Sequence, residues 1–254
     1  MKNTDIEITG SKVAAVTFAF WVMKIAATTL GETAGDLLSM TLDLGYALGS
    51  AVLVAAFFLL LALQVSARRF HPALFWSVVL ATSTAGTTIS DLLDRTLGLG
   101  YALGSTLLAT CLALILLAWR RSEGSISVSR IDSRKAEIFY WSAVLFSNTL
   151  GTALGDFLAD DSGLGFAGGA ALVGALILAT ALATRIRSIS KVVLFWIAFV
   201  LTRPFGATFG DVLTKPLEKG GLDFGTLGSS LILFSILACL VTFSVLQRRA
   251  ETAR

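Results

Sequence analysis

Long apolar segments alternate with short polar ones along the whole chain. Eight apolar segments can be placed, at 13–38, 45–66, 72–93, 99–119, 136–158, 164–184, 192–213 and 225–246. Each is long enough for a helix to cross a hydrocarbon layer about 30 Å thick. The ~10-residue alternating strands of a membrane barrel are absent. The pattern predicts an all-α polytopic membrane protein with about eight transmembrane helices.

The longest polar stretch, 120–135, divides the chain into two halves. The predicted organisation is a tail at 1–12, four helices in 13–119, a linker at 120–135, four helices in 136–246 and a tail at 247–254. The N-terminal stretch is polar and has no apolar core followed by a small-residue cleavage site, so no secretory signal is expected.

The basic residues predict which side of the membrane each loop faces. Three of the 20 Lys and Arg residues, Arg95, Lys215 and Lys219, lie in loops on one side. Two more, Lys24 and Arg203, lie within apolar segments, and the other 15 lie in loops or tails on the opposite side. Short loops rich in Lys and Arg stay in the cytoplasm. We therefore expect an inner-membrane, multi-pass protein of bacterial type with both termini cytoplasmic.

Four stretches of the chain repeat one another. They are "FWVMKIAATTLGETAGDLL" (20–38), "FWSVVLATSTAGTTISDLL" (75–93), "YWSAVLFSNTLGTALGDFL" (140–158) and "FWIAFVLTRPFGATFGDVL" (195–213). They align on Asp36, Asp91, Asp156 and Asp211, and each carries Trp fifteen residues and Gly five residues before its Asp. Such agreement indicates internal duplication. The second segment of each unit repeats as well, so the unit is predicted to be a helical hairpin of about 55 residues.

Two helices per unit return the chain to the same face, so the four units are parallel repeats. Small residues four apart recur in both helices of the units, as at Gly31 and Gly35 and again at Gly45 and Gly49. Such pairs let two helix backbones approach closely. We expect four hairpins around a pseudo-four-fold or nested two-fold axis. The repeated residues Trp21, Trp76, Trp141 and Trp196 should then lie at matching depths.

A polar stripe precedes each repeated Asp in steps of four residues, which places its members on one helix face. The stripes contain Lys24, Thr28 and Glu32 before Asp36; Ser83 and Thr87 before Asp91; Asn148 and Thr152 before Asp156; and Arg203 before Asp211. The second helix of each unit is almost entirely apolar. The first helices are therefore predicted to line a shared axis, and the second helices to face lipid.

Charge within a membrane span is costly, at about 2.5–3.5 kcal/mol for a group at the bilayer centre. The repeated Asp residues lie near the outer interface, and Lys24 and Arg203 could pair with carboxylates. Two interpretations follow. The Asp residues could be structural caps that bond the backbone of the following turn, or they could form a functional site, which is the usual role of ionisable residues in spans.

The donor types bear on the chemistry of such a site. Carboxylates, hydroxyls and an amide are hard oxygen ligands that suit Mn²⁺, Mg²⁺ or Ca²⁺. One histidine and the two distant cysteines, Cys111 and Cys239, disfavour a haem, an iron–sulfur cluster or a soft-metal site. No catalytic or phosphate-binding motif is present, so we expect no enzyme, no bound cofactor and no nucleic-acid partner.

At these motifs the chain resembles a known family. The units "GETAGD", "GTALGDFL" and "GATFGDVL", and the opening "FWVMKIAATTLGETAGDLLSMTLDLGYA", are similar to bacterial integral membrane proteins built from a repeat of unknown function. The resemblance covers nearly the whole chain and implies a multi-repeat inner-membrane protein without an established activity. By analogy, "ETAGDL" (32–37) is similar to the E-x-G-D-[KR]-[TS] motif of small calcium and manganese exchangers. It is one residue longer and lacks the basic residue.

The leading functional hypothesis is a transporter of a divalent cation of the Mn, Mg or Ca class, with proton coupling as an option. Glu32 and Asp36 would be the metal ligands, and Asp91, Asp156 and Asp211 would line the same pathway. The alternatives are a transporter of a small organic solute that uses Lys24 and Arg203, and a non-transporting membrane scaffold or sensor. The expected partners are the lipid bilayer and the cation or solute, and a homo-oligomer is compatible with the sequence.

Overall fold

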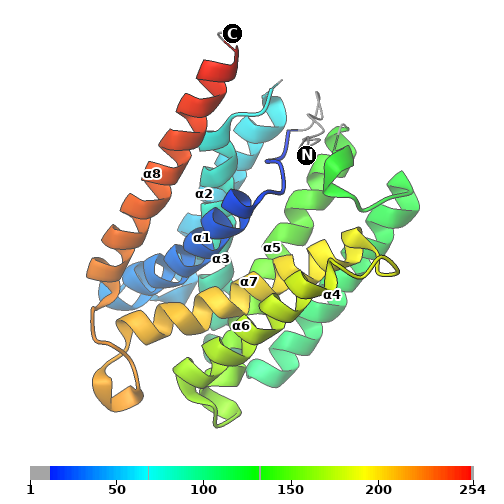
Figure 1. Ribbon diagram of the computed structural model, residues 1–254. Helices are drawn as coiled ribbons and strands as arrows, with labels where there is room; N and C mark the ends of the chain where they lie inside the picture. Colours follow the sequence, from blue (N-terminus) through cyan, green and yellow to red (C-terminus); the bar gives the residue numbers. More distant parts are fainter. Residues whose placement is uncertain (1–11, 68, 132, 253–254) are drawn as a thin grey trace.

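The computed structural model describes residues 12–67, 69–131 and 133–252. Within these residues there are eight long helices and no strands (Figure 1). The helices are α1 (Phe18–Asp36), α2 (Gly45–Ser66), α3 (Pro72–Asp91), α4 (Tyr101–Glu123), α5 (Arg134–Asp156), α6 (Gly165–Ala183), α7 (Lys191–Thr214) and α8 (Thr226–Thr252). The predicted all-α architecture is confirmed.

Local sequence signals set several helix ends. The Thr17 hydroxyl accepts a hydrogen bond from the Phe20 amide, and this N-cap starts α1 at Phe18 rather than at residue 13. The Ser133 hydroxyl caps α5 in the same way, and Pro72 occupies the first turn of α3. Gly124, with φ 74°, ends α4 in the left-handed conformation that glycine adopts most readily.

The odd-numbered helices form a closed central ring, in which α1 packs between α3 and α7, and α5 packs between the same two helices on the opposite side. The glycine five residues before each Asp fixes the register. A Cβ added at Gly31 would lie 2.9 Å from the carbonyl carbon of Ser83, and one at Gly86 would lie 3.0 Å from that of Asn148. Gly151 faces Arg203 and Pro204, and a Cβ at Gly206 would lie 2.8 Å from the carbonyl carbon of Thr28. Each glycine thus meets the equivalent position of the next repeat, so the four helices run parallel.

The even-numbered helices lie outside this ring, but each packs on the following repeat rather than on its own. Helix α2 packs on α3, α4 on α5 and α6 on α7, and α8 returns to α1. The remaining faces of these helices expose large apolar side chains such as Leu59, Leu114, Leu178 and Phe243. The predicted division into inner polar helices and outer apolar helices is confirmed.

Six of the described helices are long and apolar enough to cross a membrane: α2, α4, α6, α7 and α8, and α3 together with the turn that follows it. Helices α1 and α5 fall outside this group. Helix α1 contains three charged residues, Lys24, Glu32 and Asp36, and the middle of α5 contains the polar residues Ser147, Asn148 and Thr149. Both are nevertheless members of the ring and run parallel to α3 and α7, which belong to the group.

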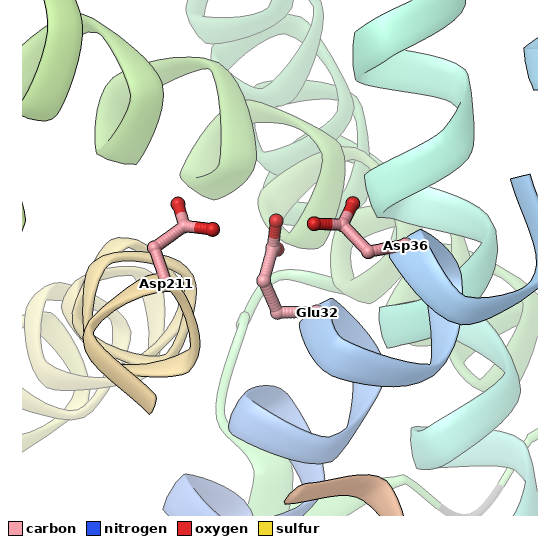
Figure 2. A group of neighbouring side chains, drawn as sticks. All are labelled: Glu32, Asp36 and Asp211. Carbon is pink, nitrogen blue, oxygen red and sulfur yellow. The ribbon is translucent and has the colours of Figure 1, made fainter. Parts of the chain in front are cut away.

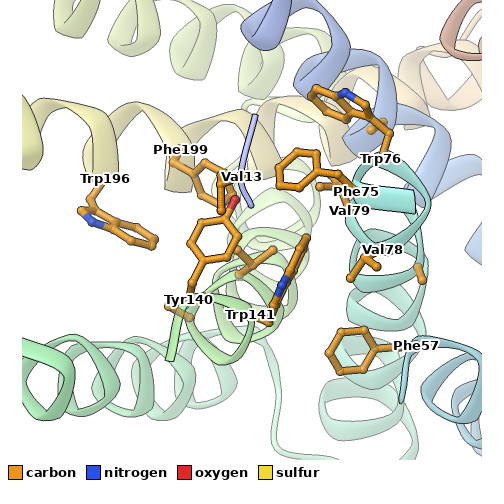
Figure 3. Packing of buried hydrophobic residues seen from close by; sticks show 14 of the residues in the cluster. Val13, Phe57, Phe75, Trp76, Val78, Val79, Tyr140, Trp141, Trp196 and Phe199 are labelled. Carbon is orange, nitrogen blue, oxygen red and sulfur yellow. The ribbon is translucent and has the colours of Figure 1, made fainter. Parts of the chain in front are cut away.

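An aromatic belt closes one end of the ring, which we call the aromatic end. The residue sixteen positions before each Asp contacts the tryptophan of the next repeat. The pairs are Phe20–Trp76, Phe75–Trp141, Tyr140–Trp196 and Phe195–Trp21, with ring centroids 5.6, 5.5, 6.5 and 5.7 Å apart. The four tryptophans therefore lie at matching depths, as predicted. Val13 is buried among these rings, beside Tyr140 and Phe199 (Figure 3).

The opposite end, where the odd helices finish, is the carboxylate end. The first three repeats each make a π-helical turn directly after their Asp, at Leu37–Thr41, Leu92–Thr96 and Phe157–Asp161. In the fourth repeat α7 continues to Thr214 without a π turn. Short π segments often occur at functional sites because they redirect the side chains around them.

The prediction that glycines at the start of the even helices are packing residues is wrong for the first glycine of each pair. Gly45, Gly100, Gly165 and Gly225 have φ between 67° and 71°, and an added Cβ at any of them would have no atom within 4 Å. They turn the chain into the even helices, and glycine adopts this left-handed backbone without strain. The second glycine of a pair does pack: Gly104 lies against the carboxylate of Asp94, and Gly169 against Thr208.

Candidate functional site

The four repeated Asp residues lie at one level of the ring, and each is at most 4% exposed. Two basic side chains link them in pairs. Arg95 Nε lies 2.8 Å from Asp91 Oδ1, and Arg95 Nη2 lies 3.3 Å from Asp156 Oδ2. Lys215 Nζ lies 3.0 Å from Asp211 Oδ1 and 2.9 Å from Asp36 Oδ2. Each base therefore joins the Asp of its own repeat to the Asp of the next repeat.

This pairing gives the site two-fold rather than four-fold character. Arg95 and Lys215 both come four residues after the Asp of their repeats, in the second and fourth units. The first and third units carry Met40 and Asp160 at that position. Repeats one and three thus supply an Asp alone, and repeats two and four supply an Asp with a base. Of the two arrangements that the sequence left open, pseudo-four-fold and nested two-fold, this alternation agrees with the nested two-fold one.

Three carboxylates gather on one side of the site. Glu32, Asp36 and Asp211 each offer an oxygen, and these oxygens all lie within 4.8 Å of one another. The side chains point toward one another from α1 and α7 (Figure 2). The Lys215 ammonium lies between two of the three, Asp36 and Asp211. Asp211 thus lies beside Glu32 and Asp36, the two residues that the sequence analysis predicted as metal ligands.

Glu32 is bound from the centre of the ring. Arg203 Nη2 lies 2.9 Å from Glu32 Oε2, and the same nitrogen donates to the Thr87 hydroxyl. Thr87 Oγ1 in turn lies 3.3 Å from Glu32 Oε2, and the Ser83 carbonyl accepts a further bond from Arg203. Arg203 is fully buried, so the predicted pairing of a central base with a carboxylate is confirmed for this residue.

Lys24 behaves differently, and the idea that it neutralises a carboxylate is wrong. Its Nζ donates to the amide oxygen of Asn148 over 3.1 Å and lies 4.3 Å from the centre of the Phe199 ring. The Asn148 side chain is held by its own bond to the Thr82 hydroxyl. No carboxylate contacts Lys24 among the residues that the structure describes, although the side chain is fully buried.

The two central bases cross the ring diagonally. Lys24 reaches from α1 to α5, and Arg203 reaches from α7 to α3. Neither pair of helices is adjacent in the ring, so both side chains pass through its centre. Together with the aromatic belt they separate the carboxylate end from the aromatic end.

The remaining members of the predicted stripes also lie inside the ring and are buried. Thr28 Oγ1 donates to the carbonyl oxygen of Thr202 on α7 over 3.1 Å. Thr152 Oγ1 donates to the carbonyl oxygen of Asn148, one turn back on the same helix, over 3.4 Å. The structure therefore brings all four stripes together, although several hydroxyls bond the backbone rather than face a ligand.

Sequence reasoning missed the role of Arg95 and Lys215, which it treated only as loop residues. The signal was available, since both continue the stripe by four residues beyond Asp91 and Asp211. Burial by itself would lower the pKa of the Lys215 ammonium, but the neighbouring carboxylates of Asp211 and Asp36 outweigh it and raise the pKa well above its ordinary value. The stabilisation from such a raised pKa is fully present below the ordinary lysine pKa of about 10.4, so this group stays charged across the physiological pH range.

Formal charges within the network of ion pairs at the carboxylate end do not balance. Five buried carboxylates, those of Glu32 and the four Asp residues, contact three basic groups in the described chain, Arg95, Arg203 and Lys215. The difference leaves two formal negative charges. Buried charge is costly unless it is paired, so the arrangement favours a ligand that brings positive charge.

Comparison with known proteins supports the repeat structure. A family model described as "Repeat of Unknown Function (DUF347)" matches four segments of the chain, at 19–70, 74–125, 139–189 and 194–250. Each segment holds one odd helix and the even helix after it. Neither the comparison with curated proteins nor the comparison with solved structures gives a match.

Proposed function

We propose that this chain, which belongs to the DUF347 family of repeats of unknown function, is a membrane transporter for a divalent cation. The observation that carries the proposal is the cluster of Glu32, Asp36 and Asp211, whose oxygens lie within 4.8 Å of one another in a buried site. Several hard oxygen donors at this spacing suit Mn²⁺, Mg²⁺ or Ca²⁺. Asp91 and Asp156 belong to the same level of the ring and contribute to its negative charge.

The two unmatched formal charges support a divalent cation as the substrate and protons as the coupling ion. One divalent cation would neutralise the two unmatched formal charges, and so would two protons. Exchange of one for the other would leave the charge of the site unchanged, which avoids the cost of carrying net charge through a low-dielectric layer. Proton coupling is therefore the coupling that this site supports best.

The two ends of the ring suggest how the site is reached. Lys215 and Arg95 border the site at the carboxylate end, and their side chains are 21% and 37% exposed. Toward the aromatic end, Arg203, Lys24 and the aromatic belt fill the ring. Under this proposal, the structure would be a state closed toward the aromatic end. Transport requires these crossing side chains to move.

The orientation, the location and the absence of catalysis belong to the same proposal. The basic loops favour an inner membrane of bacterial type with both termini in the cytoplasm. The carboxylate end would then face outward. The proposal includes no enzymatic reaction, no resident cofactor and no nucleic-acid partner; lipid and the transported cation are the partners.

Flux through reconstituted protein tests the proposal. Purified chain in liposomes should move Mn²⁺, Mg²⁺ or Ca²⁺, with proton movement in the opposite direction reported by an internal pH dye. Glu32→Gln should abolish the flux, while Glu218→Gln, in the exposed loop before α8, should not. Absence of flux and of binding for all three cations would refute a transport role and favour the scaffold or sensor hypothesis.

A second candidate rests on the two central bases. Arg203 Nε and Nη1 are buried and have no hydrogen-bond partner in the described part of the chain, and Lys24 has only a neutral partner. These groups could receive the carboxylate of a small organic solute. Binding of organic anions that is lost in Arg203→Met, with no cation binding by the wild type, would favour this candidate over the first.

A further inference from the structure

We infer that Lys215 is a tethered competitor for the cation site, so that its ammonium occupies the position between Asp36 and Asp211 that the cation takes when it binds. The inference rests on the proposed function and identifies the residue that sets cation affinity. Its basis is geometric, since Nζ lies 2.9 Å from Asp36 Oδ2 and 3.0 Å from Asp211 Oδ1. These are two of the three residues of the carboxylate cluster.

The backbone of Lys215 is fixed. Its long, flexible side chain can leave the site without movement of that backbone. Lys215 follows the last residue of α7 and has extended backbone angles. Its carbonyl oxygen accepts a hydrogen bond from the Asp223 amide over 3.0 Å, and the Leu222 amide donates to the Val212 carbonyl oxygen over 2.7 Å. These two hydrogen bonds hold the loop before α8 against the end of α7. A side chain with four methylene groups on this anchor can swing toward solvent, where it is already 21% exposed.

The equivalent base in the other half is held more firmly. The Arg95 guanidinium makes two separate contacts, from Nε to Asp91 and from Nη2 to Asp156. It also lies 5.7 Å from the centre of the Tyr101 ring. A planar guanidinium suits such multiple contacts, whereas a lysine ammonium is a compact point charge on a flexible stem. Among the residues that the structure describes, no third carboxylate joins Asp91 and Asp156 in a cluster as tight as that of Glu32, Asp36 and Asp211. Exchange is therefore assigned to the Lys215 side alone.

Displacement of Lys215 couples the position of its side chain to whether a cation occupies the site. When a divalent cation enters, the ammonium gives up its direct contacts with Asp36 and Asp211 but stays tethered at the carboxylate end, so the formal charge count of that end still includes it. When the cation leaves, the ammonium returns and keeps Asp36 and Asp211 from facing each other as unpaired charges. The empty site is stabilised in this way without a bound ion.

Manganese binding to purified protein tests the inference, with Lys215→Met as the informative variant and Arg95→Met as the matched control. Removal of a competitor that occupies the site about nine-tenths of the time should tighten binding about tenfold. We expect Lys215→Met to have a lower melting temperature than wild type without metal, and to regain more of it than wild type when Mn²⁺ is added. Arg95→Met should melt earlier but show no tighter binding.

Lys215→Arg serves where Lys215→Met does not fold, because it keeps the positive charge and both ion pairs. A guanidinium there should hold the carboxylates more persistently and weaken Mn²⁺ binding. If wild type binds Mn²⁺ and Lys215→Met binds it no more tightly, the inference is overturned while the proposed function stands. Binding by Lys215→Met alone would support the tether and show that it blocks the wild-type site. Absence of binding in wild type, Lys215→Met and Lys215→Arg alike would overturn both.

Discussion

The two ion-pair clusters at the carboxylate end occupy equivalent positions in the two halves of the chain, yet they differ in the base and in the number of carboxylates that they contain. In one, Arg95 joins Asp91 to Asp156, and no third carboxylate of the described chain clusters tightly with them. In the other, Lys215 joins Asp211 to Asp36, and Glu32 brings a third carboxylate that Arg203 holds from the ring centre. Glu32 in repeat one occupies the position that Thr152 has in repeat three. Under the proposed function, this exchange of a hydroxyl for a carboxylate is what distinguishes the cation-binding cluster from the structural one.

The largest effect should come from disrupting the close contact between α1 and α3, which helps to hold both clusters at one level of the ring. Gly35→Leu would place a side chain against Thr87, since even a Cβ there would lie 2.9 Å from the Thr87 Cβ. Overpacking of this kind, with no room for α1 and α3 to stay in contact, should cost at least ~3 kcal/mol. We expect little folded protein in a detergent-solubilised preparation analysed by size exclusion. Gly228→Leu on the outer helix α8, where an added Cβ meets nothing within 4 Å, should be tolerated.

The next largest effect concerns Arg203, which distinguishes the two clusters. Arg203→Met would leave Glu32 as a buried carboxylate without its base, and the loss of one partner of a buried pair costs about 3–5 kcal/mol. A thermal melt should show a strong decrease for this variant. The double variant with Glu32→Gln should recover a good part of it. If the double variant melts no higher than Arg203→Met, the ion pair is not what holds this part of the ring.

Neutralising one Asp in each cluster compares their functions directly. Asp36→Asn and Asp91→Asn each remove one of two carboxylates from a base, so each should destabilise the protein by about 1–3 kcal/mol. If Asp36 were a buried carboxylate without a basic partner, its neutralisation would leave stability unchanged or raise it. The ion pair to Lys215 gives the opposite expectation. Only Asp36→Asn should abolish Mn²⁺ binding, as measured by isothermal titration; equal loss in Asp91→Asn would mean that both clusters bind the ion.

The smallest effect should come from Lys24. Because its partner is the neutral Asn148 side chain rather than a carboxylate, Lys24→Met removes a buried ammonium without leaving an acid unpaired. We expect a change in unfolding free energy within about 1 kcal/mol, in either direction. Melting curves of Lys24→Met and Arg203→Met side by side would show the contrast. A loss as large as that of Arg203→Met would point to an anionic partner for Lys24.

Most of the fold could be predicted from the sequence because the repeats carry the information four times. Helix number, the inner position of the odd helices and the level of the Trp residues all follow from hydropathy and from alignment on the Asp residues. The packing of each even helix on the following repeat could not be predicted. Apolar outer helices such as α2 and α6 carry no charge pattern that would distinguish one neighbour from another.

The site was predicted in outline, but its pairings were not. The step of four residues placed Glu32, Asp36 and Asp211 on inward faces, and the ring then brought them together. The partners of Lys24 and Arg203 depend on which diagonal each long side chain takes across the ring, and spacing along one helix does not fix that. Arg95 and Lys215 lie in predicted loops, where basic residues indicate only the orientation in the membrane. Their spacing of four residues from Asp91 and Asp211 is the signal that places them at the site.

The return of α8 to α1 has a consequence for how such a chain can assemble. The half that contains α1 to α4 ends with an outer helix that needs a following inner helix, and it begins with an inner helix that needs a preceding outer one. The half that contains α5 to α8 likewise begins with an inner helix and ends with an outer helix whose packing partners lie in the other half. Two half-chains expressed separately would therefore fit head to tail into one closed ring, and two copies of one half could do the same. Once the ring closes, no such edge remains among the described helices for a fifth repeat or for a second ring. The outward sides of the even helices are then the large apolar surface through which larger assemblies could form.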